Sequence, residues 1–228
     1  MNSIAQRLEQ VRARITQAEQ EAGRPPGSVR LLAVSKTRPV DDLRAALGAG
    51  QTCFGENYLQ DALPKIAELA SEPIEWHYIG PLQSNKTREI AEQFAWVHSV
   101  DRLKIARRLS EQRPPDRPPL NVCLQINTSG EASKSGIAPE EALELARAIA
   151  ELPRLHLRGL MTIPAPAKDF EQQRRPFRQL RELYEQLNAE GLALDILSMG
   201  MTGDLEAAIA EGSTMVRIGT AIFGARAK

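Results

Sequence analysis

The sequence predicts an α/β protein that folds as a single (β/α)8 TIM barrel with an extra N-terminal helix. Short apolar segments alternate with amphipathic segments along most of the 228 residues, which is typical of strands and helices that take turns. Eight apolar segments have the length of strands, and eight βα units in about 200 residues match the lower size limit of this barrel. A doubly wound open sheet shares the alternation and is the alternative, but the count favours the barrel.

Residues 1–23 are expected to form a helix that packs on the barrel, and residues 1–228 to form one domain. From Ile4 to Ile15, apolar residues recur at spacings of four and three, so they share one helix face. Gly23, followed by Pro25 and Pro26, is expected to end this helix.

The predicted strands are the apolar segments 29–36, 52–57, 74–80, 95–100, 120–127, 155–163, 192–200 and 213–224. Several of them are apolar without strict alternation, as parallel strands covered by helices are. An amphipathic segment follows each of the first seven strands, the longest over about residues 169–190, and a short helix is expected at the end of the eighth. The proline-rich segment 113–119 is expected to be a surface loop.

Composition indicates a small-molecule ligand. The chain has 29 basic and 29 acidic residues and a formal net charge of +0, so nothing favours nucleic acid or an anionic membrane as a partner. The charged N-terminus lacks the apolar core of a signal peptide, and no segment is long and apolar enough to span a bilayer. We therefore expect a cytoplasmic protein.

The cysteines and histidines are interpreted as structural. Cys53 and Cys123 lie in apolar surroundings and are expected to be buried, reduced thiols. His77, His98 and His156 share no metal-ligand spacing, so no metal site is predicted.

Lys36 ends the first predicted strand. Active sites of these barrels lie at the carboxyl ends of the strands. A lysine amine that loses hydration there has a lowered pKa, which favours the neutral nucleophile needed for a Schiff base. The alternative is a lysine whose stem packs on the rim while its ammonium reaches water.

The ends of the last two strands carry glycines and hydroxyls. Gly219 and Thr220 follow the eighth strand, where barrels of this kind often bind phosphate through helix N–H groups. The seventh offers Ser198 and Thr202. The alternative is a plain strand-to-helix turn capped by Thr202 or Asp204.

Arg217 lies two residues before Gly219, so strand alternation places both on one face, expected to be the lumen. Its guanidinium is either part of an ion pair with a carboxylate such as Glu56, or a donor to a ring nitrogen or phosphate of a ligand. In the polar segment 127–136, Lys134 is either part of a flap over the site or of a solvated loop.

Together these segments resemble the YggS/PROSC-like pyridoxal phosphate homeostasis protein family. The resemblance covers about residues 29–224 and rests on AVSKT, CFGENYLQDA, WHYIGPLQSNK, INTSGEASKSG, GLMTI, LSMGMTGDLEAAI and VRIGTAIFG. It implies a fold-type III barrel that binds pyridoxal 5′-phosphate (PLP), like the N-terminal domain of alanine racemase without that enzyme's additional β domain.

By this resemblance, the cofactor-binding residues are Lys36, Asn57, Ser198, Arg217, Gly219 and Thr220. Lys36 corresponds to the lysine that forms the Schiff base with PLP, and Arg217 to the arginine that faces the pyridine nitrogen. Gly219, Thr220 and Ser198 correspond to the phosphate cradle, and Asn57 to a polar residue beside the cofactor. The family commonly has a serine where Thr202 stands, so a hydroxyl is retained.

The function implied is intracellular PLP homeostasis, in which PLP is held and delivered to PLP-requiring apoenzymes. The alternative is an amino-acid racemase of limited activity; the barrel and Lys36 alone would also suit a Schiff-base aldolase. An arginine at the ring nitrogen disfavours strong carbanion chemistry. Racemases of this fold class tolerate it but need acid and base groups on both faces of the substrate, and none of Tyr58, Tyr78 and Tyr184 follows the barrel as the racemase tyrosine does. No catalytic residue is therefore assigned, and we expect a carrier and a monomer.

Overall fold

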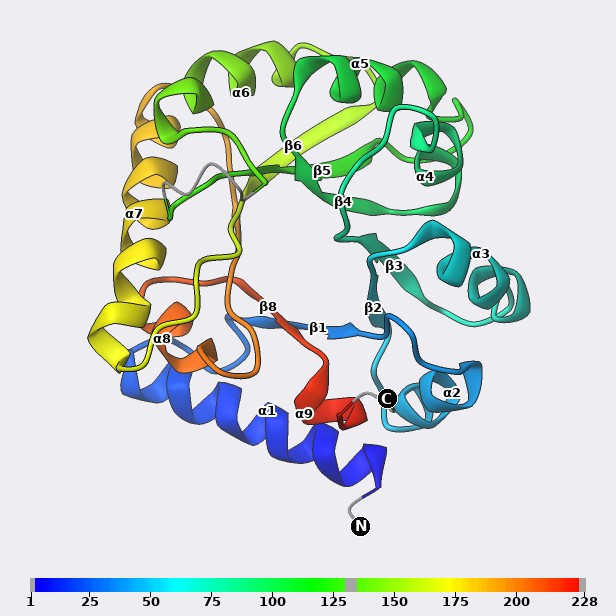
Figure 1. The fold of residues 1–228 in the computed structure, drawn as a ribbon, viewed down its shortest axis with the longest axis vertical. Helices are drawn as coiled ribbons and strands as arrows, with labels where there is room; N and C mark the ends of the chain where they lie inside the picture. The colour runs from blue at the N-terminus through cyan, green and yellow to red at the C-terminus, as the bar shows by residue number, and fades with distance from the viewer. Residues whose placement is uncertain (1–2, 130–134, 226–228) are drawn as a thin grey trace.

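Eight parallel strands close into a barrel in the computed structural model, which describes residues 3–129 and 135–225 (Figure 1). The strands are β1 (Arg30–Val34), β2 (Cys53–Glu56), β3 (Glu75–Tyr78), β4 (Trp96–Val100), β5 (Leu120–Gln125), β6 (Leu155–Met161), β7 (Ile196–Ser198) and β8 (Met215–Ile218). Each pairs with the next, and β8 pairs with β1, which sets Arg217 opposite Leu32. The predicted TIM barrel is confirmed, and the alternative of an open sheet is wrong because the sheet has no edge.

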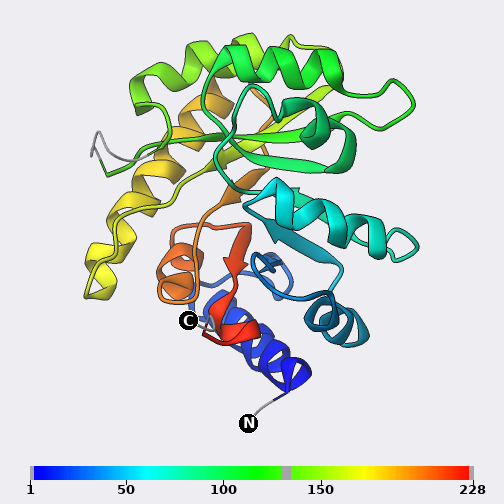
Figure 2. The same cartoon turned by 45° about the vertical axis from the view of Figure 1, so that its right-hand side comes forward.

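Helices surround the barrel in the predicted alternation (Figure 2). They are α1 (Ile4–Glu21), α2 (Val40–Gly48), α3 (Leu59–Glu68), α4 (Thr87–Gln93), α5 (Leu103–Gln112), the 3-10 helix η1 (Pro139–Glu141), α6 (Ala142–Ala150), α7 (Phe170–Ala189), α8 (Leu205–Ala210) and α9 (Thr220–Phe223). The long helix expected near residues 169–190 is α7, and the Asp169 carboxylate caps it by accepting from the Gln172 N–H at 2.8 Å. None of the helices in residues 3–129 and 135–225 is long and apolar enough to cross a membrane.

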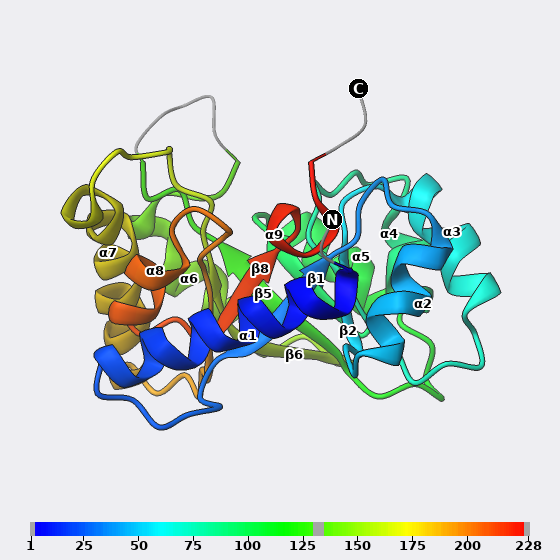
Figure 3. The ribbon, with the colours of Figure 1, turned by 90° about the horizontal axis from the view of Figure 1, so that it is seen from below.

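The N-terminal helix takes the place that the short α9 leaves in the outer ring. Figures 1 and 3 show α1 outside β8 and β1, between α8 and α2, and it contacts both of these helices and α9. Leu8, Val11 and Ile15 lie on its buried face, as the spacing predicts. The helix therefore covers the two strands at which the barrel closes.

A buried carboxylate fixes the end of α1 to the start of the barrel. Glu19 is 1% exposed and accepts from the N–H groups of Gly27 at 3.0 Å and Val29 at 2.7 Å, and from the Ser28 hydroxyl at 3.2 Å. These bonds satisfy the carboxylate without water. The segment between α1 and β1 is thereby held in one conformation.

Cys123 is buried and Cys53 is only partly buried, and both are free thiols. Burial raises the pKa of Cys123 to about 12, as expected for a thiol in the lumen. The expectation of burial is wrong for Cys53, because this residue begins β2 at the open amino end of the barrel.

A buried ion pair joins the ends of β1 and β2. The Lys65 Nζ, from α3, lies 2.8 Å from Glu56 Oε1 and donates to the Ser35 carbonyl at 2.9 Å. The Ser35 hydroxyl donates to the same Glu56 oxygen at 2.6 Å. Burial raises the pKa of the Glu56 carboxyl, and the neighbouring Lys65 ammonium opposes that rise. The pair holds the residue that precedes Lys36.

Replacing Lys65 with methionine should destabilise the protein by about 3–5 kcal/mol, since it leaves the Glu56 carboxylate buried without its counter-charge. Urea unfolding measures the change. Arg44→Ala is the control, because its pairs with Asp41 and Glu68 lie on the surface and should contribute little. A Lys65→Met protein as stable as this control would show that the buried pair does not support the fold.

Candidate functional site

A cavity of about 270 Å³ lies at the carboxyl end of the barrel. It is lined by Val34, Lys36, Asn57, Ile79, Ile163, Met201, Thr202, Gly203, Arg217, Gly219 and Thr220. Five of the six predicted site residues are among them, and they come from the ends of β1, β2 and β8. Ser198 does not line the cavity.

Lys36 reaches the cavity from a constrained turn. Val34 lines the same cavity two residues earlier, so alternation brings the Lys36 side chain to the lumen side of the strand end. Thr37 has a φ of 63°, a left-handed conformation that a β-branched residue rarely adopts. The Arg38 N–H closes the turn on the Ser35 carbonyl at 3.0 Å. This strained turn, together with the Ser35 contacts, fixes where the lysine leaves the strand.

Arg217 is buried and is bound by oxygen acceptors that carry no charge. Its Nη1 donates to the Ser198 carbonyl at 2.6 Å and to the Ser198 hydroxyl at 2.9 Å, and its Nη2 donates to the Thr162 carbonyl at 2.8 Å. The alternative of an ion pair with Glu56 is wrong, since Glu56 binds Lys65 instead. Among the described residues, these bonds use three of the five guanidinium N–H groups.

The guanidinium stays charged in this setting. Burial lowers the pKa of Arg217 to about 10, while the Asp204 carboxylate acts in the opposite direction. At neutral pH it is therefore protonated and acts only as a donor. A buried cation with remaining N–H groups at a cavity wall favours a ligand that brings an acceptor.

The turns after β7 and β8 present donors to the same cavity. Gly219 and Thr220 begin α9, and no carbonyl among the described residues accepts from the N–H groups of Thr220 and Ala221. Thr202, from the loop between β7 and α8, also lines the cavity. Asp204 does not cap α8 with its side chain, since its carboxylate accepts from the Met201 N–H at 2.6 Å. Together these groups suit an anion such as a phosphate.

Asn57 offers an acceptor that has no partner. Its Oδ1 is buried and makes no hydrogen bond within the part of the chain that the structure describes. A buried acceptor left in this state costs free energy, which a donor from a ligand would recover. Asn57 lines the same cavity as Lys36, so this acceptor is a candidate contact for a ligand there.

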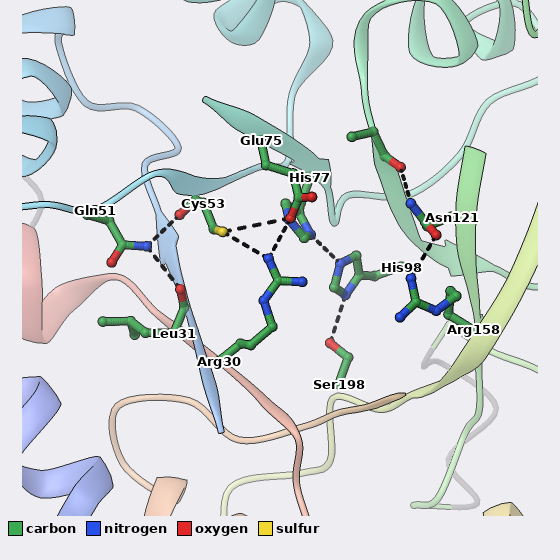
Figure 4. A network of polar contacts seen from close by, with 11 residues as sticks. Arg30, Leu31, Gln51, Cys53, Glu75, His77, His98, Asn121, Arg158 and Ser198 are labelled. Atoms are coloured by element: carbon green, nitrogen blue, oxygen red, sulfur yellow. Dashed lines mark hydrogen bonds and ion pairs between the residues drawn. The ribbon is translucent and has the colours of Figure 1, made fainter. Parts of the chain in front are cut away.

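Ser198 lies in the lumen, where it links Arg217 to two histidines. Its hydroxyl is 2.7 Å from His98 Nδ1, and His98 Nε2 is 2.9 Å from His77 Nδ1 (Figure 4). From the sequence, both histidines are expected to be structural. Strand alternation, which puts both on inward-facing positions of neighbouring strands, is the signal that could have joined them.

The hydrogen bonds that run from Ser198 through His98 to His77 form a lumen chain. This lumen chain ends at a polar cluster near the amino end of the barrel. Ligand-type atoms of Cys53, Glu75 and His77 lie within 4.8 Å of one another. The Arg30 Nη2 is 2.7 Å from Glu75 Oε1 and 3.2 Å from Cys53 Sγ, so a guanidinium already balances the carboxylate. This cluster could not be predicted from the sequence, because residues 53, 75 and 77 have no metal-ligand spacing. Lys134, the suggested flap residue, lies outside the described residues.

Comparison with known proteins gives matches over the whole chain. The family model for the N-terminal domain of alanine racemase matches residues 6–227. A pyridoxal phosphate homeostasis protein from Pseudomonas aeruginosa is 63% identical over 226 residues, which cover 99% of this chain and 97% of that protein.

Solved structures agree. PipY from Synechococcus elongatus PCC7942, with PLP bound, aligns with a TM-score of 0.82 at 37% identity and covers 97% of this chain and 100% of its own. Alanine racemase from Corynebacterium glutamicum aligns with a TM-score of 0.70 at 18% identity, over 97% of this chain and 62% of the racemase chain. At that identity the likeness is one of fold alone.

Gly80→Ala should disturb the site through Asn57. A Cβ on Gly80 would lie 2.0 Å from the Asn57 carbonyl oxygen, so the backbone that carries the unpartnered amide must shift. Overpacking of this kind costs about 1–3 kcal/mol, which urea unfolding measures. Gly48→Ala is the control, because a Cβ there meets nothing within 4 Å. Equal stabilities of the two variants would show that the Asn57 backbone is not tightly held.

Proposed function

Because the chain belongs to the alanine racemase N-terminal domain family and, within it, to the pyridoxal phosphate homeostasis proteins, we propose that it binds PLP as a Schiff base on Lys36 and serves in the homeostasis and delivery of this cofactor. The proposal rests on one observation, which is that Lys36 and a buried, protonated Arg217 line the same cavity. An amine and a fixed cation on one cavity wall suit a ligand with an aldehyde and an acceptor ring nitrogen.

Each polar group of PLP has a counterpart in the cavity. The Lys36 amine would condense with the aldehyde and release water, and Arg217 would donate to the pyridine nitrogen. Asn57 Oδ1, which has no partner among the described residues, would accept from a donor beside the aldehyde. The turn of Gly219 and Thr220, with the N–H groups at the start of α9, would hold the phosphate.

The guanidinium of Arg217 disfavours strong carbanion chemistry. Racemases of this fold class tolerate such a group but need acid and base groups on both faces of the substrate, and no second base is identified among Tyr58, Tyr78 and Tyr184. A guanidinium donates to the pyridine nitrogen without protonating it, so PLP bound here would be a weak electron sink. Bound PLP supplies an aldehyde that captures amines, and a weak sink favours holding over carbanion chemistry. The proposal includes PLP-requiring apoenzymes as recipients, a monomeric state and a cytoplasmic location.

Lys36→Ala should abolish covalent retention of PLP. Wild-type protein mixed with PLP should show the visible absorption band of a Schiff base, and borohydride reduction followed by peptide mass spectrometry should find the label on Lys36. Lys104→Ala, which removes an exposed lysine, should keep the band. A band of undiminished strength in Lys36→Ala would show that another amine anchors PLP.

Arg217→Ala should weaken PLP binding by about tenfold to a hundredfold, since a hydrogen bond from a charged donor contributes about 1.5–3 kcal/mol. The absorption band should also shift, because the donor at the ring nitrogen is gone. Equilibrium titration and the spectrum measure these changes. Unchanged affinity and spectrum would show that Arg217 serves only the carbonyls and the hydroxyl that it binds in the barrel.

Two assays separate delivery from catalysis. PLP-loaded protein should reactivate a PLP-requiring apoenzyme, and Lys36→Ala protein should do so poorly because it does not retain the cofactor. The same loaded protein, incubated with single L-amino acids, should give no more D-isomer than free PLP does. Turnover above free PLP would favour the racemase.

A further inference from the structure

Hydrogen bonds run without a break through the lumen from Glu75 to Arg217. Glu75 Oε1 is 2.9 Å from His77 Nε2, and His77 Nδ1 is 2.9 Å from His98 Nε2. His98 Nδ1 is 2.7 Å from the Ser198 hydroxyl, which is 2.9 Å from Arg217 Nη1. Figure 4 shows the part from Glu75 to Ser198, in which the imidazole of His77, from β3, contacts that of His98, from β4.

The surroundings of the chain favour neutral histidines and an ionised Glu75. The imidazoles are fully buried, and burial lowers the pKa of His77 and lowers that of His98 further, well below its usual value. The hydrogen bond from His77, with further help from Arg30, lowers the pKa of Glu75 to about 2. A carboxylate therefore terminates the chain at one end, and a guanidinium at the other.

These charge states fix the direction of every bond. The Glu75 carboxylate can only accept, so His77 carries its proton on Nε2 and donates. A neutral imidazole has one N–H, so His77 Nδ1 accepts from His98 Nε2, and His98 Nδ1 accepts from the Ser198 hydroxyl. The Ser198 oxygen then accepts from Arg217. A single assignment of tautomers thus pairs every donor in the lumen chain with an acceptor.

The neighbours of the chain hold its members in place. The His77 ring stacks on Trp96, with ring centroids 5.3 Å apart and an interplanar angle of 7°. Arg30 donates to Glu75 at 2.7 Å and balances its charge. Apolar side chains would fill a lumen at a lower desolvation cost than polar ones. A chain of fully paired polar side chains that leads to Arg217 therefore indicates that these side chains have a role at the cavity.

We infer that Glu75, His77 and His98 are positioning residues for the PLP site: they hold the Ser198 hydroxyl so that its oxygen accepts from Arg217, which fixes the direction of the remaining guanidinium N–H groups. The inference rests on the proposed function. Ser198 contributes to PLP binding by this route, through Arg217, from a place outside the cavity lining.

The first test examines the chain without ligand. Nitrogen-15 NMR of the imidazoles in the PLP-free wild-type protein should show His77 and His98 as neutral Nε2–H tautomers throughout pH 6–8, a range around the usual histidine pKa of about 6.5. The exposed His156 gives a reference signal in the same spectrum. An Nδ1–H tautomer, or a protonated imidazole, at either buried position would overturn the proposed chain.

The second test is a double-mutant cycle on PLP affinity. His98→Leu should weaken binding about tenfold in the wild-type background and by less than about twofold in Arg217→Ala, because His98 acts through the arginine. Met161→Leu, at a fully buried apolar position, should leave the affinity unchanged. Equal losses in both backgrounds would indicate a general effect on the fold and sink the inference.

The two tests keep the inference separate from the proposed function. If wild-type protein takes up no PLP, the proposed function fails, and with it the ligand named here. The NMR measurement needs no ligand and still decides the direction of the chain. If PLP binds but the cycle is additive, the proposed function stands and the positioning role falls.

Discussion

The closure of β8 on β1 is the contact on which the rest of the structure depends. It converts a sheet into a barrel, so alternate residues of every strand point into a lumen where side chains replace water. It also sets Arg217 beside β1, the strand that leads into the turn of Lys36. Two residues separated by most of the chain thereby share one cavity, and every polar group in the lumen must find its partner there.

The position of the Lys36 amine depends on contacts outside the barrel that stabilise this closure. Glu19 fixes the end of α1 before β1, and α1 covers the two closing strands because the chain after β8 forms only the short α9. The Glu56–Lys65 pair then holds Ser35, which follows β1, through hydrogen bonds to its hydroxyl and its carbonyl. The strained turn at Thr37 is maintained by these contacts, so the packing of distant elements determines where Lys36 enters the cavity.

Patterns local to a strand could be predicted from the sequence, and pairings between strands could not. Apolar runs and their number predicted the barrel, and alternation placed Arg217 on the inward face. Register is what the sequence does not contain, so the sequence could not show that the Ser198 hydroxyl lies against His98. The same limit hid the contact between His77 and His98, and the Lys65 partner that excludes Glu56 from Arg217.

The hydrogen bonds of the lumen chain have a single direction. An ionised Glu75 at one end and a protonated Arg217 at the other give the chain a fixed direction, in which each neutral group donates toward the carboxylate. With Glu75 ionised, reversing it would require the buried His77 to take up a second ring proton against burial. Arg217 is protonated at neutral pH and acts only as a donor, which suits the acceptor nitrogen of the proposed ligand. A donor that does not protonate that nitrogen would leave PLP a weak electron sink, so any carbanion chemistry would depend on acid and base groups beside the substrate.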